Sequence, residues 1–189
     1  MRFLTVLLYS SLAGALLSGP VNTATAEETQ EAGKAVSAFT MTTTAFLDQG
    51  SIPLLYTCDD KNLSPEFSWT NPPAHTKSFA LVLADPDAPG GIWYHWLLYN
   101  IPANSTEILQ GMEKLPPGTL SGKNSWGKSV YNGPCPPKGT VHNYVFTLYA
   151  LDTMLKLPAG ADAKTLFAAM KGHVLKTLTQ TAVYSRWLK

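Results

Sequence analysis

Three nearly continuous apolar runs constrain the fold of this chain more than any other feature. They span residues 79–84 (FALVLA), 95–101 (HWLLYNI) and 144–151 (YVFTLYAL). Runs of this length that are rich in aromatic and β-branched residues, and bounded by Pro, Gly and Asp, are typical of buried strands. Because no amphipathic helical pattern lies between them, we expect antiparallel pairing rather than strand–helix–strand units.

The composition agrees with a single, mostly β domain. The chain has 189 residues, of which 45% are hydrophobic, and this fits one domain and excludes a disordered chain. Its 14 glycines and 14 prolines favour a loop-rich β domain over a helix bundle. Basic residues number 14 and acidic residues 13, and a chain without a basic excess is not expected to bind nucleic acid.

The N-terminus has the pattern of an export signal. Arg2 is the only charged residue before Glu27, and an apolar run over residues 3–17 precedes Ala24-Thr25-Ala26. A basic start, an apolar stretch and an A-x-A site are typical of a cleaved signal peptide. The run is shorter than the roughly 20 residues of a spanning helix, so we expect a periplasmic or secreted protein with no membrane association after cleavage. We therefore divide the chain into a signal peptide (1–26), a flexible leader (27–38) and a folded domain (39–189).

A helical pattern is confined to the end of the chain. Asp162 is a suitable N-cap, and apolar residues follow it at helical spacing. We therefore predict one helix of about four turns that packs on the β core and contains His173. The apolar residues that define it are Leu166, Phe167, Met170, Val174, Leu175 and Leu178.

Polar side chains gather at the ends of the apolar runs. Asp85 follows the first run, His95 opens the second, and His142 and Tyr144 stand at the start of the third. If the first two strands form a hairpin and the third enters at the same end, these side chains share one cleft. A cationic imidazole there would donate a charge-assisted hydrogen bond to an anion. A tyrosine hydroxyl would add a neutral donor, and a carboxylate would orient a histidine.

Several motifs in this region occur in a fixed order along the chain. They are Tyr56-Thr57-Cys58-Asp59, Asp85-Pro86-Asp87-Ala88-Pro89, His95-Trp96, Gly133-Pro134-Cys135-Pro136-Pro137 and His142-Asn143-Tyr144. With these motifs, residues 56–189 resemble the phosphatidylethanolamine-binding protein family, which includes the Raf kinase inhibitor protein. The resemblance is closer to its bacterial Raf-kinase-inhibitor-like branch. DPDAP by itself is a weak signal, but the ordered set is highly specific.

The resemblance implies both a fold and a site. The fold is a Greek-key-like sandwich of two antiparallel sheets with peripheral helices, one of them late in the chain. The site is a small anion pocket for phosphate-type groups. Matched motif by motif, the pocket residues are Asp85, Asp87, Pro89, His95, Cys135, His142 and Tyr144.

Two structural predictions concern the loops around this pocket. Export places Cys58 and Cys135 in an oxidising compartment, where an even number of cysteines favours pairing. Both stand in motifs that flank the proposed pocket, so we predict a disulfide between them. The resemblance also favours a cis peptide bond at Ala88–Pro89.

Alternative functions remain open at this point. Asp85, His95, Cys135 and His142 are ligand types that suit a zinc site. Cys135 with His142 as base would suit a thiol hydrolase. The family resemblance also allows an inhibitor of a peptidase or kinase that acts through protein–protein contact. We predict instead a non-enzymatic binding protein without cofactor or metal, which takes a small phosphate-containing or other anionic ligand, with inhibition as the alternative.

Overall fold

The structure is a computed structural model and describes residues 37–112 and 114–187. The predicted signal peptide and most of the predicted leader lie outside the described residues. The strands are β1 (Thr40–Thr42), β2 (Phe67–Thr70), β3 (Ser78–Asp85), β4 (Trp93–Pro102), β5 (Glu107–Ile108), β6 (Leu120–Ser121), β7 (Val141–Leu151) and β8 (Val174–Ser185). The helices are the α-helix α1 (Ala163–Met170) and the 3₁₀ helices η1 (Leu54–Tyr56) and η2 (Gln110–Met112).

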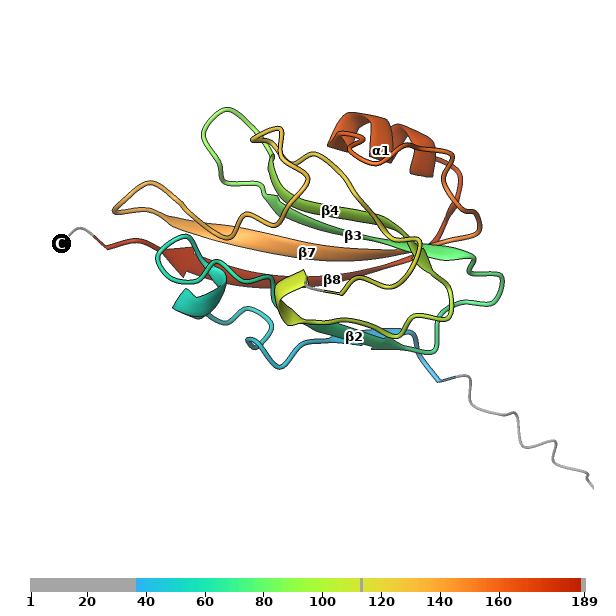
Figure 1. Cartoon of the computed structure of the whole chain (residues 1–189). Coiled ribbons are helices and arrows are strands. Elements are labelled where there is room, and N and C mark those ends of the chain that lie inside the picture. Colours follow the sequence, from blue (N-terminus) through green and yellow to red (C-terminus); the bar gives the residue numbers. More distant parts are fainter. Residues whose placement is uncertain (1–36, 113, 188–189) are drawn as a thin grey trace, which may run out of the picture. The chain divides into compact units, whose positions relative to one another are not determined.

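The strands form two antiparallel sheets, which confirms the predicted fold class (Figure 1). The larger sheet has the order β6-β4-β3-β7-β8 and the smaller sheet the order β1-β2-β5. The three apolar runs of the sequence become β3, β4 and β7 in chain order, and these are the three inner strands of the larger sheet. Each of them pairs with its neighbours in antiparallel fashion, as expected.

Both faces of the larger sheet are covered, and this explains the unbroken apolar runs. One core lies between the two sheets, where Phe79 and Leu81 of β3 meet Phe67 of β2. A second core lies under α1, where Ala80 and Val82 of β3 join the cluster that contains side chains of the helix. A strand that is buried on both faces has no polar alternation to preserve.

The predicted four-turn helix is wrong in its second half. The helix α1 ends at Met170, and Gly172 has a φ of 83°, a left-handed conformation that suits glycine and ends the helix. His173 therefore lies in a turn rather than in a helix, and the chain continues as β8. The spacing from Val174 to Leu178 fits a helix, but it fits the two-residue repeat of a strand equally well. The threonines of this segment favour the strand.

The predicted cis bond is also wrong. Every peptide bond in the described part of the chain is trans, including Ala88–Pro89. The loop between β3 and β4 instead turns at Gly90 and Gly91, which have φ values of 93° and 118°. Among the described residues, no helix is long and apolar enough to cross a membrane.

Candidate functional site

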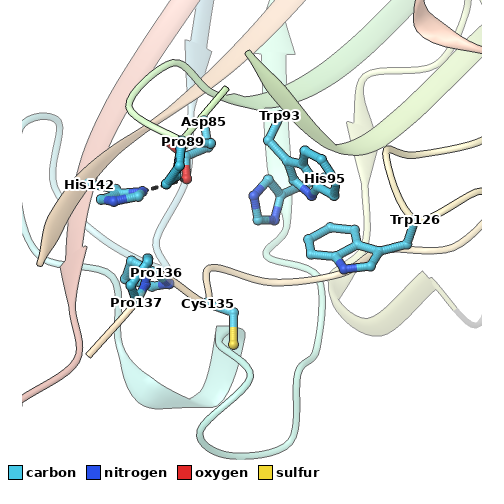
Figure 2. Close-up of a pocket in the computed structure, with 10 residues that line it drawn as sticks. Asp85, Pro89, Trp93, His95, Trp126, Cys135, Pro136, Pro137 and His142 are labelled. Atoms are coloured by element: carbon cyan, nitrogen blue, oxygen red, sulfur yellow. Dashed lines mark hydrogen bonds and ion pairs between the residues drawn. The ribbon is translucent and has the colours of Figure 1, made fainter. Parts of the chain in front are cut away.

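Three strand ends meet at one end of the larger sheet. The strand β3 ends at Asp85, which pairs with Trp93 at the start of β4. The strand β7 begins at Val141 and runs antiparallel to β3, so its start lies beside the end of β3. The structure therefore brings Asp85, His95 and His142 together as the sequence predicted (Figure 2).

These strand ends and the loops beside them enclose a cavity of about 270 Å³ (Figure 2). Its walls are formed by Asp85, Ala88, Pro89, Trp93, His95, Trp126, Cys135, Pro136, Pro137 and His142. Five of the seven predicted pocket residues, namely Asp85, Pro89, His95, Cys135 and His142, are among them. The other two, Asp87 and Tyr144, are not wall residues.

A β-bulge in β4 aims His95 toward the cavity. Tyr94 and Trp96 pair with adjacent residues of β3, so His95 between them is an extra residue without a partner. Such an extra residue breaks the alternation of side chains between the two faces of a strand. His95 and Trp96 consequently both face the core between the sheets, where the His95 ring lies 5.3 Å from the ring of Tyr144.

The central polar contact of the cavity is a buried pair of Asp85 and His142. The His142 Nδ1 lies 2.8 Å from Asp85 Oδ2. The side chain of His142 is 7% exposed and that of Asp85 is 5% exposed. The other carboxylate oxygen, Oδ1, accepts the backbone N–H of Asp87 at 2.9 Å. Since a carboxylate only accepts hydrogen bonds, Nδ1 of His142 carries a proton, and this fixes the orientation of the ring.

His95 has a neutral partner instead of a carboxylate. Its Nδ1 lies 2.7 Å from the backbone carbonyl of Asn132, which also only accepts. Burial lowers the pKa of His95 below its ordinary value, and it outweighs the opposite effects of the Asn132 carbonyl and of the Asp85 carboxylate. The rings of Trp126 and His95 pack edge to face with 5.0 Å between the centroids, so the indole covers part of this imidazole.

Asn124 was not among the predicted site residues. Its side chain connects the two segments beside the cavity that contain Trp126 and Asn132. Its Nδ2 donates to the side-chain oxygen of Asn132 at 2.8 Å and to the carbonyl of Val130 at 3.0 Å. Its Oδ1 accepts the backbone N–H groups of Trp126 and Lys128 at 3.0 and 3.1 Å. The side chain is buried, so these bonds are shielded from water.

The two sets of bonds give Asn124 a defined role in the site. Its oxygen shapes the turn that presents Trp126, and its amide group fixes the residue whose carbonyl orients His95. A local signal existed in the sequence, because Asn124-Ser125-Trp126-Gly127 has the composition of an Asx turn. Gly127 completes this turn with a φ of 74°. The contact with Asn132 had no such signal.

The loop that carries Cys135 is tied to the loop that carries Cys58. The N–H of Gly133 donates to Asn62 Oδ1 at 2.7 Å, and a Cβ at Gly133 would lie 2.2 Å from the carbonyl oxygen of Tyr56. Only glycine fits at this close approach. A disulfide joins Cys58 and Cys135 across a sequence separation of 77, with Cα atoms 5.5 Å apart, which confirms the predicted pairing.

The disulfide also bears on the alternatives that need a free thiol. In the oxidised protein, Cys135 offers no thiolate to attack a substrate or to bind zinc. Within residues 37–112 and 114–187, no cluster of three or more His, Cys, Asp or Glu side chains is arranged to hold a metal ion.

Asp87 and Tyr144 support the site from outside its walls. Asp87 is exposed, and its carboxylate accepts the backbone and side-chain N–H groups of Asn143, each at 2.8 Å. These bonds lower the pKa of Asp87 and connect the loop after β3 to the start of β7. Tyr144 is fully buried next to His95, and its hydroxyl has no hydrogen-bond partner among the described residues. Burial, with a smaller effect of the Asp85 carboxylate, raises the pKa of Tyr144.

Comparison with known proteins finds a matching family and similar proteins over most of this chain. Residues 42–185 match a family model described as Phosphatidylethanolamine-binding protein. A UPF0098 protein of Methanothermobacter thermautotrophicus is 47% identical over 147 residues, which cover 76% of this chain and 97% of that protein. A candidate lipoprotein of Mycobacterium tuberculosis, LppC, is 41% identical over 128 residues, which cover 67% of this chain and 62% of that protein.

A solved structure shares the fold of this chain. The crystal structure of YbcL from Escherichia coli, described as a new member of the mammalian PEBP family, has a TM-score of 0.75 to this chain at 31% identity. The superposition covers 81% of this chain and 100% of YbcL. The shared fold therefore extends over nearly all of the described residues.

Proposed function

The chain belongs to the phosphatidylethanolamine-binding protein family, and on that premise we propose that it is an exported, non-enzymatic binding protein whose cavity holds a small phosphate-type anion. One observation carries this proposal. Two buried imidazoles, His95 and His142, line the same cavity of about 270 Å³, which has room for a phosphate group and a short substituent.

The electrostatics of the walls favour an anion once an imidazole is protonated. An imidazolium donates a charge-assisted hydrogen bond, which is worth about 1.5–3 kcal/mol. The surrounding proline and tryptophan side chains lower the local dielectric and strengthen such a bond. Asp85 repels an anion, but its lone pairs are directed to His142 and to the backbone of Asp87, so its role is to orient the site.

Binding without catalysis fits the chemistry of the walls. An acyl- or phosphoryl-transfer site needs a nucleophile beside a base. Among the described wall residues, Cys135 is bonded to Cys58, and no serine, threonine or lysine is present. The Asp85 carboxylate is already hydrogen-bonded to His142 and to the backbone of Asp87. Export is supported by the same disulfide, because such bonds persist in oxidising compartments. The likeness to a candidate lipoprotein supports it as well.

Titration of the purified protein with inorganic phosphate tests this function. We expect His95→Ala to weaken phosphate binding about 10- to 150-fold, because it removes one hydrogen bond between the imidazole and the charged ligand. His173→Ala is the matched control outside the cavity and should keep the affinity within about twofold. Circular dichroism spectra of both variants would show that they are folded. Equal affinity of the wild-type protein and folded His95→Ala would contradict the proposal.

A further inference from the structure

The hydrogen bonds around the cavity determine which atoms are left for a ligand. Nδ1 of His95 donates to the Asn132 carbonyl, and Nδ1 of His142 donates to Asp85. A neutral imidazole that donates through Nδ1 has a lone pair, and no proton, at Nε2. In their neutral forms, both histidines can therefore only accept a hydrogen bond from a ligand.

The rest of the inner wall supplies few donors. Pro89, Pro136 and Pro137 have no N–H group, and the carboxylate of Asp85 only accepts. The remaining side-chain donors among the wall residues are the indole N–H groups of Trp93 and Trp126. The side chains of the deep, polar part of the cavity therefore offer more lone pairs than protons when both histidines are neutral.

We propose that this cavity selects an oxyanion that still carries a proton, such as a hydrogen phosphate or a phosphomonoester monoanion, over a fully ionised oxyanion such as sulfate. The inference rests on the proposed anion-binding function and names the ligand class of that same site. A hydrogen phosphate donates its own O–H to Nε2 of His95, so the bond forms without any proton from solvent. Sulfate has no proton to donate, and it binds only after Nε2 of His95 has taken up one proton from solvent.

His95 is the histidine that makes this distinction. Its Nδ1 partner is a neutral carbonyl, whereas His142 has a carboxylate partner. Proton uptake by His95 is opposed by its burial and by the nearby His142 of β7, and it is favoured by Asp85 at the end of β3. The other titratable group that faces it is Tyr144 of β7, which meets the ring edge to face.

Calorimetric titrations with sodium phosphate and sodium sulfate, at pH 6.0 and 7.0 and constant ionic strength, test the selection. Uptake of one proton per sulfate should reduce the sulfate affinity about tenfold over this pH unit. The phosphate affinity should fall less than about threefold, since phosphate retains a proton throughout this range. The heat of sulfate binding should also depend on the ionisation enthalpy of the buffer, and the heat of phosphate binding much less.

Two variants assign the effect to the correct residue. His95→Gln has an amide that does not titrate, so its sulfate affinity should lose the pH dependence. His173→Gln, outside the cavity, should retain it. Equal pH dependence for both anions in the wild-type protein would overturn the selection and leave the anion pocket in place. Absence of binding of either anion at both pH values would overturn the proposed function itself. An unchanged pH dependence in His95→Gln would overturn the assignment to His95.

Discussion

The two ends of the larger sheet each carry a histidine–aspartate pair with the same geometry. At the cavity end, His142 Nδ1 lies 2.8 Å from Asp85 Oδ2, and at the opposite end His173 Nδ1 lies 2.8 Å from Asp152 Oδ1. The surroundings differ. The side chains of His142 and Asp85 are 7% and 5% exposed, whereas those of His173 and Asp152 are 47% and 41% exposed.

This comparison shows that a contact distance alone does not identify a functional site. Water screens the exposed pair and can replace either partner, so the pair contributes little to stability. The buried pair has no such replacement, and each group depends on the other for its hydrogen bond. Burial by the cavity walls therefore makes the Asp85–His142 pair both costly to break and able to orient a ligand-binding imidazole.

The largest expected difference between the two ends is in the cost of removing the aspartate. Asp85→Ala should lower the free energy of unfolding by about 3–5 kcal/mol, because it leaves a buried histidine without a partner. Asp152→Ala should lower it by less than about 1 kcal/mol. Urea unfolding at pH 7 measures both values. Similar losses for the two variants would show that burial does not separate the two pairs.

A smaller effect is expected in the pH dependence of stability. Because the pKa of His95 is lowered in the folded state, the unfolded chain binds its proton more readily. The contribution of His95 is therefore complete above the unfolded value near pH 6.5, and it is lost as pH falls toward the folded pKa. The slope is at most about 1.4 kcal/mol per pH unit.

Unfolding free energies of the wild-type protein, His95→Asn and His173→Asn between pH 7.5 and 5 measure this contribution. His95→Asn should be less sensitive to acid than the wild-type protein. His173→Asn, which leaves His95 in place, should keep the loss of stability that His95 causes in acid. If His95→Asn loses stability with acid as steeply as the wild-type protein, His95 is not the buried group that resists protonation.

The sequence was sufficient to predict the inner strands and the position of the cavity. Unbroken apolar runs identify strands that are buried on both faces, and antiparallel pairing brings Asp85, His95 and His142 to one end. The secondary structure at the end of the chain was harder to predict, because residues spaced by four, such as Val174 and Leu178, satisfy the repeats of both a helix and a strand. Only the pairing of β8 with β7 decides between them.

The remaining parts of the site depend on contacts between distant residues. The bonds from Asn124 to Asn132, and the close approach of Gly133 to Tyr56, follow from loop packing and leave no periodic pattern in the sequence. Motif matching placed Asp87 and Tyr144 in the correct region, but it could not show whether each side chain faces the cavity. Tyr144 lies on the same face of β7 as His142, two residues further along the strand, and is covered by His95.

The most direct test of anion binding at the buried end of the sheet is an NMR titration of the histidine side chains with inorganic phosphate. The chain has four histidines, of which His95 and His142 line the cavity while His75 and His173 lie outside it. We expect the ring resonances of His95 and His142 to shift together with one saturable affinity, while those of His75 and His173 stay within the change caused by salt alone. Saturable shifts of His173 with unchanged His95 and His142 would contradict the claim that the buried end of the sheet is the binding site.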